Sequence, residues 1–275
     1  MQTHTFRNLS LTLAIAGALG TAPAWAGSTD QNAQDSQQSD AQQSVSETNN
    51  ATASASGIEA ESTKTAYYAA GILQGQMQQT ESQQIPQQLL SNVQCVGVFP
   101  AVLKVGLVFA GAHGDGIISC RDDSGSWDGS APVFFGLSSG SVGAQAGAKT
   151  TELIVLFNDK SAVKQLSDGS FKFGANVDVT AGELGAHAKV STQPAPIVAY
   201  RMDQTGAFAG ADIEGTVIQA NDEANHNIYG QNVTTQQLLS ESTQIPENVQ
   251  VFNRALAEFT SNQSSQPQGS QSNNG

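Results

Sequence analysis

One glycine-rich segment, Gly111-Ala-His-Gly-Asp-Gly116, holds the residues best suited to acid–base or metal chemistry. His113 and Asp115 stand two positions apart there, and His226 lies far later, close to Asp222. None of these histidines has a second ligand at the spacing of a zinc motif. Turn or surface positions therefore explain them better than a metal site, and an enzyme would require such side chains to gather in space.

Two other kinds of site are also unsupported by the sequence. The acidic turn Asp122-Asp123-Ser-Gly125 lacks the alternating ligands and the terminal glutamate of a calcium-binding EF-hand loop. Lys104 and Lys149 do not have the spacing of a phosphate-binding Walker lysine. The sequence thus predicts a noncatalytic protein with no cofactor and no bound metal.

The chain has two cysteines, Cys95 and Cys120, each within apolar, strand-like sequence. A glycine-rich reversal separates them and could place them on neighbouring strands. In an exported protein an even cysteine count favours a disulfide, and the alternative is a pair of buried thiols. In the chain-entropy model, a bond closing a loop of roughly 25 residues stabilises the fold by about 3–4 kcal/mol.

Residues 59–80 have the periodicity of an amphipathic helix. Its apolar face consists of five residues: Ala66, Ala69, Ile72, Leu73 and Met77. Two interpretations of this face remain open. It is either part of the domain's own core, as is usual for such a stripe, or a surface that inserts into lipid.

The block from Cys95 to Gly230 is dense in glycine and short apolar runs, which exclude a long helix because glycine costs about 1 kcal/mol per helical position. We expect closely packed strands there, with a bend near Pro100, a buried strand over 153–157 and a short helix capped by Asp159. Helices are predicted on both sides of this block. The fold class is therefore α+β, a glycine-rich, mainly antiparallel β core flanked by helices at both ends.

The two ends of the chain differ from this core. Residues 1–26 resemble a secretory signal peptide, with Arg7, an apolar run and a small-x-small site ending at Ala26. Residues 27–57 and 261–275 are rich in Gln, Ser and Asn, and we expect them to be disordered. The predicted domain spans residues 58–260. Cleavage near Ala26 would give a periplasmic or secreted protein.

The whole chain is acidic, with 11 Lys and Arg against 24 Asp and Glu and a net charge of −13. Nucleic acid is therefore an unsuitable partner, because its phosphates require basic side chains. The same charge weakens a simple attraction to anionic lipid.

The order of the glycine-rich pieces resembles the SYLF domain family across about residues 60–260. The matching pieces are Cys95-Val-Gly-Val-Phe-Pro100, Lys104-Val-Gly106, Gly114-Asp-Gly116, Cys120-Arg121, Trp127, Ala131-Pro132, Gly143-Ala-Gln-Ala-Gly147, Gly206-Ala-Phe-Ala-Gly210 and Asp222 through Tyr229-Gly230.

The resemblance implies phospholipid binding, with phosphoinositides as the ligands of eukaryotic members, which use a basic segment near the start of the domain. Here that segment has Lys64 against Glu59 and Glu61, so it departs from the basic pattern. The sequence therefore predicts a noncatalytic phospholipid-binding protein of the bacterial envelope, in contact with a phospholipid or a membrane surface. The alternative is a structural or protein-interaction module without lipid binding.

Overall fold

The computed structural model describes residues 32–106, 109–142, 147–174, 179–181, 195–202, 215–241 and 243–261. The chain separates into two compact units, residues 1–49 and residues 50–275. In the first unit the described residues, 32–49, are helical. The second unit contains the sheet and the remaining helices, and all further description concerns it.

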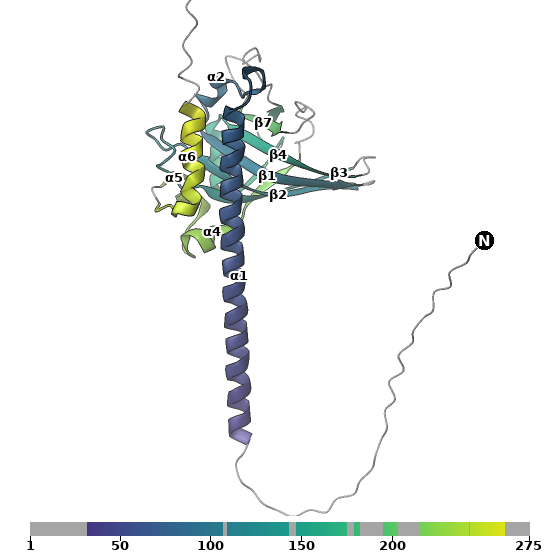
Figure 1. Cartoon of the computed structure of the whole chain (residues 1–275), viewed down its shortest axis with the longest axis vertical. Coiled ribbons are helices and arrows are strands. Elements are labelled where there is room, and N and C mark those ends of the chain that lie inside the picture. The colour runs from purple at the N-terminus through teal and green to yellow at the C-terminus, as the bar shows by residue number, and fades with distance from the viewer. Residues whose placement is uncertain are drawn as a thin grey trace, which may run out of the picture. The chain divides into compact units, whose positions relative to one another are not determined.

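The centre of this second unit is an eight-stranded sheet in the order β5-β8-β3-β2-β1-β4-β7-β6 (Figure 1). All neighbouring strands are antiparallel except β6 and β7, which are parallel. The bounds of the strands are β1 Cys95–Gly106, β2 Phe109–Cys120, β3 Val133–Val142, β4 Gly147–Phe157, β5 Ser170–Lys172, β6 Val179–Ala181, β7 Ile197–Met202 and β8 Val217–Ala220. The predicted α+β class with a mainly antiparallel core is confirmed.

The described helices flank this sheet in the chain, as the sequence predicts, and a short one also lies between β4 and β5. Their bounds are α1 Asn32–Met77, the 3₁₀ helix Glu81–Gln83, α2 Gln87–Leu90, α3 Lys160–Ser167, α4 Asp222–Tyr229, α5 Thr235–Ser240 and α6 Glu247–Ser261. The predicted cap of α3 is confirmed, because the Ser161 backbone N–H donates to Asp159 Oδ1 at 2.7 Å.

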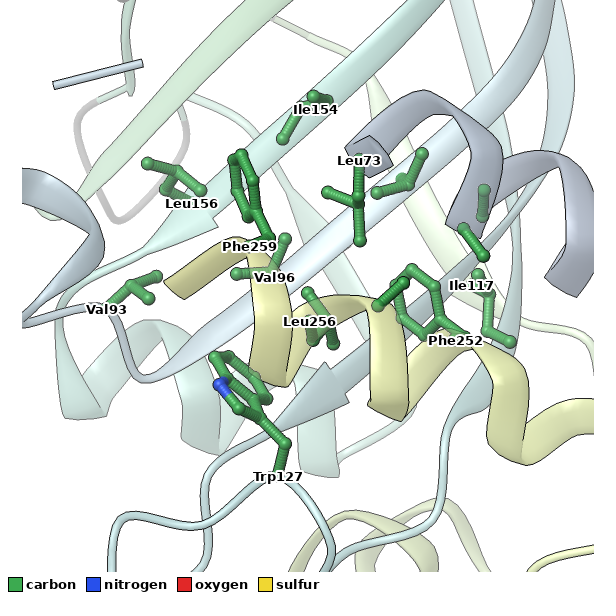
Figure 2. Packing of buried hydrophobic residues seen from close by; sticks show 14 of the residues in the cluster. Leu73, Val93, Val96, Ile117, Trp127, Ile154, Leu156, Phe252, Leu256 and Phe259 are labelled. Carbon is green, nitrogen blue, oxygen red and sulfur yellow. The ribbon is translucent and has the colours of Figure 1, made fainter. Parts of the chain in front are cut away.

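Alternating side chains of the strands enter two separate hydrophobic cores. On one face, Val96, Val98 and Ile117 pack with α1 and α6, as Figure 2 shows around Phe252, Leu256 and Phe259. On the other face, Phe99 and Ile118 belong to a cluster that includes residues of α3 and α5. The sheet is therefore the middle layer of three, and its strands are apolar on both faces because both are covered.

The structure bends the central strand β1 at the predicted position. The pairing of β1 shifts register between Val98 and Leu103 against β2, and between Phe99 and Val102 against β4. Pro100 lies within this bulge, where a missing backbone N–H is tolerated inside a sheet. Gly114 passes directly beside it, since an added Cβ there would lie 2.6 Å from the Ala101 carbonyl oxygen. The bulge divides the sheet into a covered half and a projecting half.

Two features of the helices differ from the sequence-based expectations. α1 begins at Asn32, whereas the sequence predicts disorder over 27–57 and a helix only from 59. Residues 32–56 contain no glycine or proline, and their alanine and glutamine residues favour a helix once it has started. The structure also contains α4, which the sequence analysis treats only as a family motif. The sequence also predicts a strand over 184–192, and this segment lies outside the described residues.

Candidate functional site: the projecting end of the sheet

The face of α1 predicted as a lipid-inserting surface is part of the core. Ala66, Ala69 and Leu73 are fully buried, and Ile72 and Met77 are partly buried against the same cluster. Figure 2 shows Leu73 directed toward the residues of α6 and the sheet. This burial favours the core interpretation of the five residues, and their insertion into lipid stays an untested prediction. An amphipathic helix buries its apolar face within its own domain when a sheet face is available to cover it.

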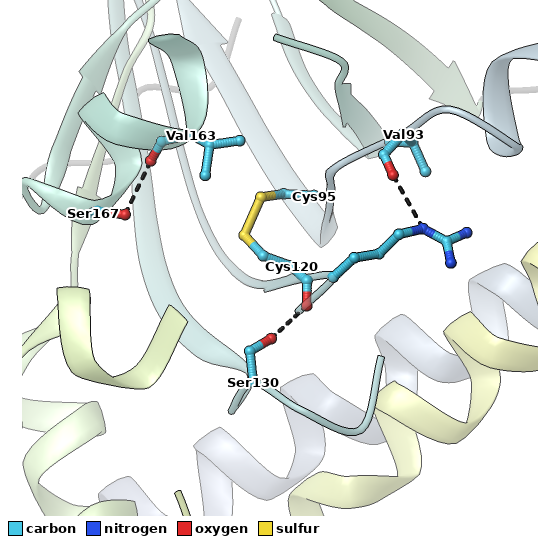
Figure 3. Close-up of a disulfide and its surroundings, with 7 residues drawn as sticks. Val93, Cys95, Cys120, Ser130, Val163 and Ser167 are labelled. Atoms are coloured by element: carbon cyan, nitrogen blue, oxygen red, sulfur yellow. Dashed lines mark hydrogen bonds between the residues drawn. A yellow bond between two sulfur atoms is a disulfide. The ribbon is translucent and has the colours of Figure 1, made fainter. Parts of the chain in front are cut away.

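The predicted disulfide joins Cys95 of β1 to Cys120 of β2, and both residues are buried (Figure 3). The two cysteines stand directly opposite each other at the covered end of the sheet. Near it, the Ser130 hydroxyl donates to the Cys120 carbonyl, and Arg121 Nε donates to the Val93 carbonyl at 3.1 Å. The bond therefore fastens the end of the sheet opposite to its projecting part and is structural.

Arg121 also belongs to a turn that connects the sheet to α6. Its guanidinium lies over the Trp127 ring at 4.6 Å, and Trp127 Nε1 donates to Thr260 Oγ1 at 2.9 Å. Partial burial lowers the pKa of Arg121. In the same turn, the Ser124 hydroxyl and the Ser126 backbone N–H donate to Asp122 and lower the pKa of its carboxyl. These charges hold a turn together, which agrees with its interpretation as a plain turn.

The histidines do not form a site in the described structure. His113 is exposed on β2, two residues from Asp115, and stands opposite Ser138 of β3. Ser138 lies in the spacing Gly136-Leu-Ser-Ser-Gly140, which matches the Gly-x-Ser-x-Gly nucleophile motif of hydrolases. However, it stands within an extended strand rather than at a strand–turn–helix elbow, and no hydrogen bond joins it to His113 among the described residues. His226 lies on α4, and His187 lies outside the described residues.

Within the described ranges, no group of three or more His, Cys, Asp or Glu residues is placed to hold a metal ion. In that same part of the chain, no helix combines the length and hydrophobicity needed to cross a membrane.

An apolar surface is exposed where β1 to β4 continue past the bulge. Leu103 and Val105 of β1 are 46% and 47% exposed, although both are large apolar residues in a central strand. Figure 1 shows these strands projecting beyond α1 and α6. The two side chains share one face of the sheet because successive residues alternate between faces.

Three of the four residues opposite this pair are small, and the fourth is His113. Leu103 stands opposite His113 and Thr150, and Val105 stands opposite Gly111 and Ala148. Directly opposite residues of an antiparallel pair lie on the same face. Leu103 and Val105 therefore stand beside short side chains apart from His113, and both remain accessible to a partner.

The opposite face of the same projecting end carries lysines. Lys104 of β1 pairs in register with Lys149 of β4 and with Ala112 of β2. The sequence segments 101–113 and 138–151 contain no Asp or Glu, although the whole chain has a net charge of −13. These segments are therefore locally basic within a strongly acidic protein.

The sequence signal for this surface is the alternation Leu103-Lys104-Val105 after Pro100. Alternation of apolar and charged residues is typical of a strand with one accessible face. Pro100 and Lys104 by themselves indicate only a bend, because no local pattern shows that the helices end before this part of the sheet.

Comparison with known proteins supports the family assigned from the glycine-rich pieces. Residues 138–259 match the Ysc84 family, which is described as a Las17-binding protein actin regulator. This part of the chain is therefore similar to a Ysc84-family domain. The chain is 34% identical to Protein YSC84 of Saccharomyces cerevisiae over 169 residues, which cover 60% of this chain and 36% of that protein.

Two other relatives show the same partial overlap. LAS seventeen-binding protein 3 of Saccharomyces cerevisiae is 33% identical over 180 residues, covering 63% of this chain and 38% of the relative. SH3 domain-containing YSC84-like protein 1 of Homo sapiens is 26% identical over 179 residues, covering 64% of this chain and 52% of the relative. The chain thus spans between about a third and a half of the length of these relatives, one of which is named for binding LAS seventeen.

Proposed function

We propose that this chain is a noncatalytic phospholipid-binding protein of the bacterial envelope and that it contacts the membrane through the projecting end of its sheet. The observation that carries the proposal is the exposure of Leu103 and Val105 on a part of the sheet without carboxylates. Export through the predicted signal peptide, with cleavage near Ala26, belongs to the same proposal and would deliver the protein to the periplasm or outside the cell.

Apolar contact is the main source of affinity in this proposal. Removing a leucine or valine side chain from water stabilises the bound state by about 1.5–3 kcal/mol when burial is complete, and proportionally less for half-exposed residues. The two lysines add a smaller attraction, about 1 kcal/mol per charge near an anionic surface. The net acidity of the chain opposes that attraction, so binding should be weak and should survive raised salt.

Flotation of the mature protein with liposomes tests this proposal. The variant Leu103→Asp/Val105→Asp should lose flotation with both neutral and anionic liposomes, because a charged side chain replaces each apolar contact. The matched control is Tyr67→Asp/Tyr68→Asp, which changes another exposed apolar pair, 55% and 58% exposed, on α1. The control should float as the unchanged protein does. Equal loss in both variants, or no flotation of the unchanged protein, would contradict the proposal.

A protein partner is the second candidate, and the names of the relatives favour it. One relative is named for binding LAS seventeen, and the matching family is described as Las17-binding. The same projecting surface would then contact a protein of the envelope. Unchanged protein that fails to float with any liposome, yet is cross-linked through position 105 to an envelope protein, would favour this second function.

A further inference from the structure

One titratable side chain stands beside the exposed apolar pair of the projecting end. His113 of β2 is exposed and stands directly opposite Leu103 of β1 on one side and Ser138 of β3 on the other. Directly opposite residues of antiparallel strands lie on the same face of the sheet, with their Cβ atoms about 4.5–5.5 Å apart. The imidazole therefore belongs to the surface through which the protein is proposed to contact lipid.

His113 is also the only residue of the two projecting segments whose charge changes near neutral pH. Residues 101–113 and 138–151 contain two lysines, this histidine and no Asp, Glu, Cys or Tyr. Histidine gains its positive charge between about pH 5 and 8, whereas lysine is ordinarily charged throughout this range. Lys104 directly follows Leu103 and so lies on the opposite face of the sheet. The apolar face of the projecting end therefore gains one positive charge as the pH falls.

The charged groups that face His113 lie toward the covered half of the sheet. Asp115 follows it on the same face of β2 and lines a groove together with Glu61 of α1 and Glu223 of α4. Glu152 of β4 is exposed on that face, two strands away. The direct neighbours of His113 on β1 and β3 are uncharged. The projecting segments thus offer the imidazole no carboxylate to neutralise its charge where they would meet a bilayer.

The charge of His113 has opposite effects on two kinds of membrane. Placing an unpaired charge in an apolar layer costs free energy, so a charged imidazole opposes the contact of Leu103 and Val105 with a neutral bilayer. Near an anionic surface, the same charge is attracted to the lipid headgroups. We propose that His113 determines the lipid specificity of the projecting end. When uncharged, it permits contact with neutral and anionic bilayers, and when charged, it restricts contact to anionic ones.

This inference rests on the proposed membrane contact, and flotation of the mature protein at about pH 8 and about pH 5.5 tests it. At constant ionic strength, the apparent affinity for neutral phosphatidylcholine vesicles should fall about fivefold or more at the lower pH. The affinity for vesicles that contain phosphatidylglycerol should stay the same or rise. His113→Gln should remove the fall with neutral vesicles, because glutamine is polar but does not titrate. His113→Lys, charged at both pH values, should bind only anionic vesicles at both.

The matched control is His226→Gln, because His226 lies on α4, away from the projecting end (Figure 1). This control should keep the pH response of the unchanged protein. A fall with neutral vesicles that persists in His113→Gln, or that His226→Gln removes equally, would overturn the role of His113 and leave the membrane contact intact. An equal fall with anionic vesicles would have the same meaning. Failure of the unchanged protein to float at either pH would overturn the proposed function and this inference together.

Discussion

Replacement of Leu73 by alanine decides whether the apolar face of α1 is core or a surface for lipid. Leu73 is fully buried in the cluster formed with α6 and the sheet. Large-to-small substitutions at such sites cost about 2–5 kcal/mol, because contacts are lost and a cavity remains. With a urea slope of about 2 kcal/mol per molar, a cost of about 3 kcal/mol lowers the unfolding midpoint by about 1.5 M.

Urea unfolding followed by circular dichroism measures this shift. Gln74→Ala is the matched control, because Gln74 is the next residue of the helix and is exposed. Its effect should stay within about 0.5 kcal/mol, as is usual for surface substitutions. If Leu73→Ala shifted the midpoint no more than Gln74→Ala and instead abolished liposome flotation, α1 would be the inserting element and the assignment to the core would be refuted.

Three further predictions concern the covered half of the domain. Reducing and alkylating the disulfide should lower stability by about 3–4 kcal/mol in urea unfolding, and a loss below about 1 kcal/mol would argue against the chain-entropy estimate. Gly116→Ala should cost about 1–3 kcal/mol, because its new Cβ would lie 2.3 Å from the Phe99 ring, whereas Gly140→Ala, with open space, should be nearly neutral in the same assay. The pKa of Asp122 is lowered in the folded state, first by the Ser124 hydroxyl, so its stabilisation is present above the unfolded pKa and is lost as pH falls through the folded pKa. Asp122→Asn should therefore lower the midpoint more at pH 6 than at pH 3, and equal effects would contradict this.

Much of the fold follows from local sequence patterns. The apolar run 153–157 forms the buried part of β4, and Asp159 caps α3, because both depend on neighbouring residues. Pro100 marks the bulge in β1, because a proline is poorly tolerated elsewhere inside a sheet. The disulfide partners were also predictable, since two cysteines allow only one pairing.

The candidate surfaces depend on tertiary placement and were less predictable. The pattern of Leu73 and its neighbours is the same whether the helix packs on a sheet or on a membrane, and only the position of α6 decides between them. The exposure of Leu103 and Val105 arises because the helices end before the strands do.

The depth of Val105 in a bilayer is the most direct test of the proposed function. Both cysteines of the chain form the disulfide, so Val105→Cys introduces a single free thiol for an environment-sensitive fluorophore. With phospholipid vesicles, the emission maximum of the fluorophore at position 105 should shift to shorter wavelength. Its fluorescence should also be quenched by lipids that are brominated on their acyl chains. The same label at Tyr67→Cys should show neither change. An emission maximum at position 105 that does not change with vesicles, or equal quenching at both positions, would contradict membrane contact through the projecting end of the sheet.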